Sequence, residues 1–303
     1  MRLYYYQRRD GNSNFGDDLN SWLWSQLLPG FFDEDPTIAF IGIGTLLNHL
    51  LPQRVPQAQR LVIFGTGAGY GNPLTAVAHP WQIYCLRGRL SAQKLGLAEE
   101  LAITDAALLV RRLFQPTSQK TSRFAFMPHV HHATYAGTVL QDICTQVGLG
   151  YIDPRWSVKK VLTSISQTEV LLAEAMHGAI VADALRVPWI PVLTSPRILT
   201  FKWHDWCSSL ALEYHPYYIP PLVSAYPRFP RRRSAIAHWK NCWQQEPWLA
   251  LCQMVSQRSL WATQLLRITQ VACPSLSHAS LVEQLTDQLE NRLEQLKSDW
   301  SVQ

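Results

Sequence analysis

The feature that most constrains this sequence is a series of short apolar runs that alternate with segments of helical spacing. Runs at 38–43 and 61–64 each end in a glycine-bearing turn, and runs at 3–7 and 82–86 each lead into a polar loop. Segment 16–28, between two of these runs, carries apolar residues at the spacing of a helix. Short apolar runs flanked by glycine are typical of buried parallel strands. The first part of the chain is therefore predicted to be a parallel α/β layer.

The same alternation begins again after a polar linker at 115–122. The expected elements of this second part are strands at 124–127, 151–152, 169–172 and 189–193, and helices at 135–147, 157–166 and 176–185. From residue 235 onward the pattern is helical, with a leucine stripe across 281–296. Strands that alternate with helices in this way indicate mostly parallel sheets. We therefore predict an α/β fold with two halves, 1–118 and 119–230, and C-terminal helices within 231–303 that pack on them.

Composition and charge exclude several classes of protein. With 47% hydrophobic and 16% charged residues among 303, the chain can bury a core and is not disordered. The net charge of +5 is modest, whereas a dedicated nucleic-acid binder usually shows a basic stripe. The six cysteines form no C-x-x-C pair, so no metal site is expected. The first residues lack the apolar region of a signal peptide, and a cytoplasmic protein is expected.

Several junctions between an expected strand and the following helix carry polar residues, and ligands of α/β folds bind at such junctions. Asn14, Gly16 and Asp17 begin the first helix, where free backbone amides attract anions, although Asp17 also suits helix capping. The Gly65-Thr66-Gly67 turn brings backbone amides near a ligand. It is not a dinucleotide fingerprint, and a structural turn is an equal interpretation.

Two arginines, Arg87 and Arg89, directly follow the strand at 82–86. Guanidinium groups at a strand end suit a phosphate or a carboxylate, and a surface salt bridge is the alternative. Ser91 is expected to cap the helix that follows.

Histidines mark the next two junctions. His129, His131 and His132 follow the strand at 124–127, and no matching carboxylate spacing supports a metal site, so substrate contact or loop capping is favoured. His177 follows Glu174 at a strand-to-helix turn. The helix field there disfavours its imidazolium form, so a nearby anion would be needed to keep it charged.

In their order and spacing these motifs resemble the polysaccharide pyruvyl transferase family. The residues that carry the resemblance are Asn14-x-Gly16-Asp17, Gly65-Thr66-Gly67, Arg87-x-Arg89-x-Ser91, Thr104-Asp105, Pro128-His129 and Glu174-x2-His177-Gly178. The Tyr4-Tyr5-Tyr6 run and the Phe201-Lys202-Trp203-x-Asp205-Trp206 run are similar to its succinoglycan-type ketal-forming branch. The sequence departs from the family at Thr104-Asp105-Ala106, where Gly-Asp-Pro is common.

The resemblance implies a fold, an activity and a set of substrates. It implies two Rossmann-like domains that face each other across a cleft, as in GT-B glycosyltransferases, with the acceptor on the first domain and the donor on the second. The activity would move the pyruvyl group of phosphoenolpyruvate onto a sugar diol of an exopolysaccharide or cell-surface glycan. A cyclic ketal would form and phosphate would be released, without a metal or an organic cofactor.

The resemblance also implies roles for individual residues. His177 would be the general acid, because its unperturbed pKa lies near working pH, and Asp17 would accept the proton of the acceptor hydroxyl. The expected ligands of phosphoenolpyruvate are Arg87, Arg89, Lys202 and Arg197. Further substrate contacts are expected from Asn14, Gly16, Gly65, Thr66, Gly67, His129, Glu174 and Gly178. Trp203 and Trp206 are expected to line a sugar cleft, and Trp239, Trp243, Trp248 and Trp261 to pack the tail.

Two other functions fit the same sequence. A GT-B nucleotide-sugar glycosyltransferase would need similar cations, and Glu174 would then hold a ribose. A non-enzymatic binding protein would use the basic run Arg231–Arg233, either as a solvated linker or at a membrane surface. The second use suits a lipid-linked acceptor and a location at the inner face of the membrane. Nucleic acid is not expected as a partner, and the oligomeric state stays open.

Overall fold

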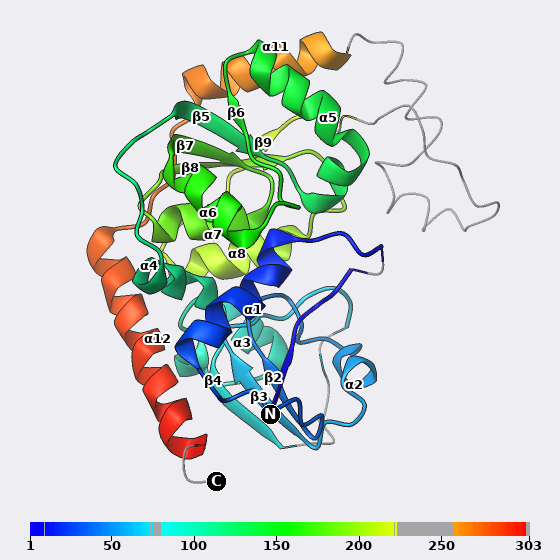
Figure 1. Cartoon of the computed structure of the whole chain (residues 1–303), viewed down its shortest axis with the longest axis vertical. Coiled ribbons are helices and arrows are strands. Elements are labelled where there is room, and N and C mark those ends of the chain that lie inside the picture. Colours follow the sequence, from blue (N-terminus) through cyan, green and yellow to red (C-terminus); the bar gives the residue numbers. More distant parts are fainter. Residues whose placement is uncertain (9, 73, 75–79, 221, 223–256, 301–303) are drawn as a thin grey trace, which may run out of the picture.

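The computed structural model describes residues 1–8, 10–72, 74, 80–220, 222 and 257–300, and it contains two parallel sheets with helices around and between them (Figure 1). The first sheet has its strands in chain order: β1 (Arg2–Tyr4), β2 (Ile38–Ile41), β3 (Arg60–Phe64) and β4 (Trp81–Cys85). The second sheet has the order β6 (Gly150–Tyr151), β5 (Ser122–Met127), β7 (Thr168–Ala173), β8 (Trp189–Leu193) and β9 (Tyr217–Tyr218). Every pairing in both sheets is parallel. The predicted α/β class with parallel sheets is confirmed.

The helices follow the strands closely in the chain. Those of the first half are α1 (Phe15–Leu27), α2 (Leu51–Arg54), α3 (Arg89–Leu95) and α4 (Val110–Leu113), with the 3-10 helices η1 (Glu99–Leu101) and η2 (Ala106–Leu109). Those of the second half are α5 (Val130–Gln146), α6 (Val158–Ser166), α7 (Met176–Ala184) and α8 (Thr200–Ser209). Near the C-terminus lie α11 (Gln257–Val271) and α12 (Ala279–Trp300).

Three local predictions need correction. Strand β1 ends at Tyr4, so the expected strand at 3–7 is too long. Helix α5 begins at Val130 rather than at 135, because the His129 side chain caps it by accepting from the backbone N–H of His131. Ser91 lies inside α3 and does not cap it, since its hydroxyl group binds Asp205 instead.

One apolar core runs from the first half into the second. Phe15 and Leu19 of α1 belong to the same buried cluster as Met176 and Ile180 of α7. Helix α7 is buried along almost its whole length, as expected of a helix that is apolar on all sides, and it lies between the two sheets (Figure 1). The first turn of α7 is therefore held firmly at the junction of the two halves.

The C-terminal helices pack on different halves of the molecule. Helix α11 packs on α5, and Trp261 is 1% exposed against Phe126, which confirms its packing role. Helix α12 runs beside β4, where the Tyr84 hydroxyl group donates a 2.9 Å hydrogen bond to Asp299. The other tail tryptophans, Trp239, Trp243 and Trp248, and the basic run Arg231–Arg233 lie outside the described residues.

The prediction that Trp203 and Trp206 line a sugar cleft is wrong. Their exposed fractions are 0% and 2%. The ring of Trp206 lies 5.2 Å from that of Trp189, and Trp203 stacks on Tyr214 at 4.9 Å between ring centroids. Four large aromatic rings bury more apolar area against one another than at a solvated cleft, so both indoles serve the core.

Candidate functional site

The imidazole of His177 joins the two halves of the molecule. His177 is the second residue of α7, directly beyond the carboxyl end of β7. Its ring lies against Gly16 in the first turn of α1, and a Cβ atom at position 16 would stand 2.1 Å from Nδ1. Only glycine leaves room for the ring here, so this part of the Asn14-x-Gly16-Asp17 motif has a steric cause.

Asp105 belongs to one of the sequence motifs, but the motif indicates no role for it. It is fully buried at the start of η2, where one of its oxygens accepts from the backbone N–H of Ala107 at 3.0 Å. Its other oxygen, Oδ2, lies 3.8 Å from Nε2 of His177. Within the described part of the chain, neither of these two buried atoms has a hydrogen-bond partner. A small rotation would join them, so the pair is poised to form a carboxylate–imidazole hydrogen bond.

Burial shifts both groups of this pair toward their neutral forms. It raises the pKa of Asp105 to about 6, against the opposing charge of Arg87. Burial also lowers the pKa of His177 to about 3, and the cations Lys202 and Arg87 lower it further. His177 is therefore neutral near pH 7 in the ligand-free protein, as the expected need for a neighbouring anion implies.

Lys202 is the central cation of the site. It is the third residue of α8, its side chain is 8% exposed, and Nζ donates to the Tyr70 hydroxyl group at 3.3 Å. Its charge acts on groups from both halves: it lowers the pKa of Asp17, of His177 and of His129. Lys202 is therefore close enough to all three groups to act on them electrostatically.

Asp17 and its neighbour Asp18 make different hydrogen bonds to Asn14. Asp18 accepts from the backbone N–H of the N-cap residue Asn14 at 3.1 Å, so it reaches back to the N-cap as the acidic residue of a capping box does. Asp17 accepts instead from the Asn14 side-chain amide at 2.6 Å. Burial raises the pKa of Asp17 to about 6, the charge of Asp18 raises it further, and the Asn14 hydrogen bond lowers it. Asp17 also lines a cavity of about 240 Å³, so a ligand can reach it.

Arg87 is fully buried and has no contact with solvent. Its Nε donates to Asp205 at 2.8 Å, and Nη1 donates to Thr45 at 2.6 Å and to the Gly44 carbonyl at 3.1 Å. Nη2 donates to the carbonyl of Ala68 at 3.2 Å. The alternative of a surface salt bridge is thus wrong, because the pair is buried. The guanidinium fixes two loops of the first half to α8, and contact with phosphoenolpyruvate stays a prediction.

The glycine-rich turn after β3 uses its backbone amides within the protein. The N–H of Gly65 donates to the Cys85 carbonyl at 2.9 Å, and that of Gly67 donates to the Gly44 carbonyl at 3.0 Å. The Thr66 hydroxyl group donates to the same Gly44 carbonyl. This geometry favours the structural-turn interpretation, and substrate contact by these three residues stays a prediction.

Two further motif glycines owe their place to close packing. A Cβ atom on Gly67 would lie 2.3 Å from the Arg87 guanidinium, and one on Gly178 would lie 2.6 Å from the sulfur of Met127. Side chains at these positions would displace Arg87 or the core beneath α7.

Glu174 holds the start of α5 in place through His129 and His132. The fully buried carboxylate accepts from the backbone N–H of His129 at 2.8 Å and from the Thr194 hydroxyl group, and it contacts Nδ1 of His132 at 3.0 Å. His132 is therefore structural. The rings of His129 and His131 stack at 5.3 Å, and both groups have a pKa below the usual range, chiefly because they are buried. Within the described residues no cluster of metal-binding side chains is present.

The remaining predicted cations lie at different depths. Arg197 is half-buried in the loop before α8, and its charge contributes to the low pKa of His129 and His131. Arg89 is exposed at the start of α3. The structure therefore brings His177, Asp17, Lys202, His129 and Arg197 into one electrostatic neighbourhood, with Arg87 and Glu174 buried beneath it and Arg89 at the surface.

Two comparisons with known proteins find similar sequences. A family model described as polysaccharide pyruvyl transferase matches residues 4–196, a stretch that contains Asp17, Asp105 and His177. The succinoglycan biosynthesis protein ExoV of Rhizobium meliloti (strain 1021) is 37% identical over 324 aligned residues, which cover 99% of this chain and 100% of that protein. No solved structure matches the chain.

Proposed function

This chain belongs to the polysaccharide pyruvyl transferase family, and from that premise we propose that it transfers the pyruvyl group of phosphoenolpyruvate to two hydroxyl groups of one sugar. A cyclic ketal would form and inorganic phosphate would be released. Similarity to a succinoglycan biosynthesis protein favours an exopolysaccharide as the acceptor. The observation that carries the proposal is that the His177 ring contacts Gly16, the neighbour of Asp17 in the chain, and that the charge of Lys202 acts on both His177 and Asp17.

The donor site must neutralise a phosphate and a carboxylate. We assign this task first to Lys202, whose partner Tyr70 is 46% exposed and so leaves a path from solvent. Arg197, whose charge acts on His129, is the second cation, and Arg89 contributes from the surface. Arg87 would act from beneath, by fixing the loops around the donor and by adding positive potential. The two parallel sheets would then flank donor and acceptor as in GT-B enzymes.

His177 would supply the proton that starts the reaction. Binding of a trianion beside a neutral imidazole favours its charged form and raises its pKa. The imidazolium can then protonate the methylene carbon of phosphoenolpyruvate, which becomes a methyl group. Positive character develops on the adjacent carbon, the one that carries the phosphate.

Asp17 would complete the transfer on the acceptor side. The first sugar hydroxyl group attacks the central carbon and gives its proton to the Asp17 carboxylate. The second hydroxyl group attacks the same carbon, the carbon–oxygen bond to phosphate breaks, and hydrogen phosphate leaves. Two hydroxyl protons are released: one replaces the proton given to the methyl group, and the other leaves on phosphate.

Asp105 would position the general acid. A carboxylate that accepts from Nε2 fixes the ring and stabilises the imidazolium, as second partners of catalytic histidines do. This leaves Nδ1, beside Gly16 and next in space to the Asp17 turn, as the nitrogen that transfers the proton. Asp105 is thus a positioning residue in this scheme.

The proposal is tested with purified protein, phosphoenolpyruvate and depyruvylated succinoglycan. We expect phosphate release together with a mass gain of one pyruvate less one water. His177→Ala should abolish both, whereas His215→Ala, which changes an exposed histidine outside the site, should abolish neither. Transfer from a nucleotide sugar with no product from phosphoenolpyruvate would overturn the proposal. The glycosyltransferase alternative is less favoured, because Glu174 is buried and both its oxygens already bind protein groups.

Contact with a membrane is a separate proposal, motivated by the basic run Arg231–Arg233 and by the idea of a lipid-linked acceptor. None of the described helices is both long and apolar enough to cross a bilayer. If the run binds anionic headgroups, changing all three arginines to serine should abolish sedimentation with anionic liposomes and leave turnover on a soluble acceptor intact. Unchanged sedimentation would remove the proposal.

A further inference from the structure

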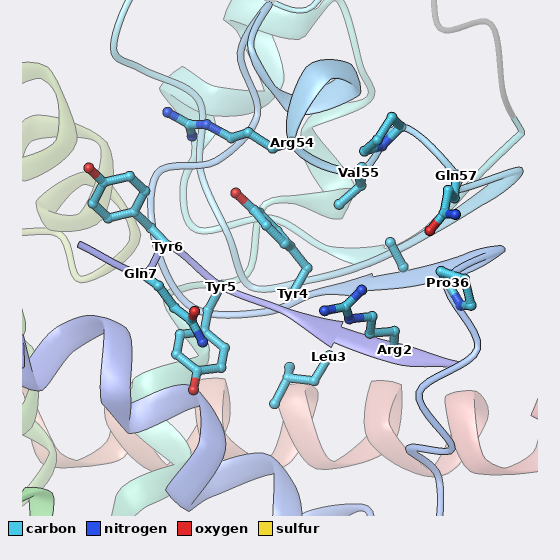
Figure 2. Close-up of a pocket in the computed structure, with 12 residues that line it drawn as sticks. Arg2, Leu3, Tyr4, Tyr5, Tyr6, Gln7, Pro36, Arg54, Val55 and Gln57 are labelled. Carbon is cyan, nitrogen blue, oxygen red and sulfur yellow. The ribbon is translucent and has the colours of Figure 1, made fainter. Parts of the chain in front are cut away.

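Two adjoining cavities follow the chain from β1 to the start of α1. The larger, of about 550 Å³, lies over β1 and the turn after α2 (Figure 2). The smaller, of about 240 Å³, reaches Asn14 and Asp17. Tyr5, Tyr6 and Gln7 line both. The two cavities therefore share one stretch of wall, and together they are here called the tyrosine groove, which residues 2–8 line and whose smaller part reaches Asp17.

Aromatic rings and a guanidinium are arranged along this groove. Figure 2 shows Tyr4 and Tyr6 on the same side of the backbone as Arg54, with Tyr5 on the opposite side, as expected for alternating side chains of an extended chain. The guanidinium carbon of Arg54 lies 5.4 Å from the centroid of the Tyr6 ring. Tyr6 is 37% exposed and Tyr4 is half-buried. The cation–π contact between Arg54 and Tyr6 holds the Tyr6 ring in place before any ligand binds.

The chemistry of the groove suits a chain of sugars. Flat aromatic rings can cover the apolar faces of sugar rings, and tyrosine hydroxyl groups, Gln7 and Arg54 offer hydrogen bonds to sugar hydroxyl groups. Its size is that of sites that hold small molecules rather than of a single small anion. The cations assigned to phosphoenolpyruvate, Lys202 and Arg197, do not line it.

We propose that the tyrosine groove binds the acceptor oligosaccharide, with the sugar to be ketalised at Asp17 and its neighbouring sugars along Tyr6, Arg54 and Tyr4. This inference rests on the proposed function, because it takes Asp17 as the group that meets the reacting hydroxyl. It adds an extended subsite to that function, so the enzyme would select a glycan chain and not merely a diol.

The test compares two acceptors: an oligosaccharide from depyruvylated succinoglycan and a methyl hexoside, which offers a diol without further sugars. Tyr6→Ala and Arg54→Ala should each raise KM for the oligosaccharide about tenfold or more, a change of the size that one lost stacking or cation–π contact produces. KM for phosphoenolpyruvate and turnover of the hexoside should not change. Tyr218→Ala, which removes a tyrosine that is 59% exposed on β9, is the matched control and should leave all three unchanged.

Direct binding separates this inference from the function on which it rests. Calorimetry with the same oligosaccharide and no phosphoenolpyruvate should show binding to the wild type, binding to Tyr6→Phe, which keeps the ring, and weaker binding to Tyr6→Ala. If the wild type binds the oligosaccharide but makes no product, the proposed function fails and the groove stands. The groove assignment is overturned if both alanine variants bind and turn over the oligosaccharide as the wild type does. It is also overturned if the variants are folded in a thermal melt but lose turnover of the hexoside as much as turnover of the oligosaccharide.

Discussion

The imidazole of His177 rests on the α-carbon of Gly16, so closely that a single methyl group at position 16 would lie 2.1 Å from Nδ1. The contact joins the first turn of α7, at the carboxyl end of the second sheet, to the first turn of α1 in the first half. The position of the proposed acid is thereby set relative to Asp17, the next residue in the chain. The geometry between His177, the proposed acid, and Asp17, the proposed base, therefore depends on Gly16.

Gly16→Ala should abolish most of the activity while the protein stays folded. The methyl group displaces the His177 ring, and a misplacement of about 1 Å can reduce a rate by about 10²-fold. Steady-state kinetics with both substrates measures the loss. Gly30→Ala is the control: its Cβ would meet nothing within 4 Å, although φ is +79°, so it should lose about 1 kcal/mol of stability and keep kcat. Equal kcat values for the two variants would contradict the steric role of Gly16.

Asp105→Asn should reduce kcat by about 10²-fold with little change in KM for phosphoenolpyruvate. The amide can keep the hydrogen bond from Ala107 but no longer stabilises an imidazolium at His177. The pKa of His177 in the substrate complex falls, so kcat should decline at a lower pH than in the wild type as pH rises. The pH profile of kcat tests this. A variant with lower kcat and an unshifted profile would show that Asp105 serves structure alone.

Asp17→Asn should change stability in a pH-dependent way. The pKa of Asp17 in the folded protein is raised to about 6 from 3.8, so the folded state holds a proton that the unfolded state releases between these values. The wild type therefore loses stability as pH rises through this window, by up to about 3 kcal/mol for a shift of this size. The asparagine variant escapes that loss and should gain stability relative to the wild type between pH 4 and pH 7.

Urea unfolding of the wild type and of Asp17→Asn at pH 4 and at pH 7 measures this gain in stability. Asp35→Asn is the control of opposite sign, because hydrogen bonds from Thr37 lower the pKa of Asp35. Its ionised form stabilises the fold above the unfolded pKa, so this variant should lose stability relative to the wild type as pH rises. The prediction for Asp17 fails if both variants move in the same direction.

Arg87→Ala should destabilise the protein by about 3–5 kcal/mol, because it leaves the buried Asp205 carboxylate without its cation. Arg112→Ala removes the guanidinium of an exposed residue that pairs with three partly exposed carboxylates on α12, and should cost about 1 kcal/mol or less. Chemical denaturation of both variants measures the difference. Similar losses for the two would mean that the Arg87–Asp205 pair does not hold the first half to α8.

Periodicity in the sequence was sufficient to predict both sheets and most helices, because their strands are short, apolar and flanked by glycine. It did not predict β9, α2 or α4, and it did not predict α8. The buried positions of this helix include Lys202 and Asp205, so they form no apolar stripe. Tertiary partners, Arg87 and Tyr70 among them, make those polar positions favourable inside the protein, and such partners are not visible in a local pattern.

The motifs identified His177, Asp17 and Lys202, but not the role of Asp105. A lone carboxylate in the apolar stretch 102–110 was the available signal. Its meaning depends on a histidine far along the chain, which only the fold brings to within 3.8 Å. Trp203 and Trp206 were misassigned for the same reason, since nothing near them in sequence shows that Trp189 and Tyr214 enclose them.

The position of α12 has a consequence for the synthesis of the protein in the cell. This helix follows β4 by about 200 residues, with Asp299 215 positions after Tyr84, yet it packs on β4, the outer strand of the first sheet to be made. Until Asp299 has emerged, Tyr84 and the apolar surface around it lack their cover. The nascent first half must therefore wait for the synthesis of α12 before this edge of its sheet is shielded, and a chain truncated before α12 exposes a template for aggregation.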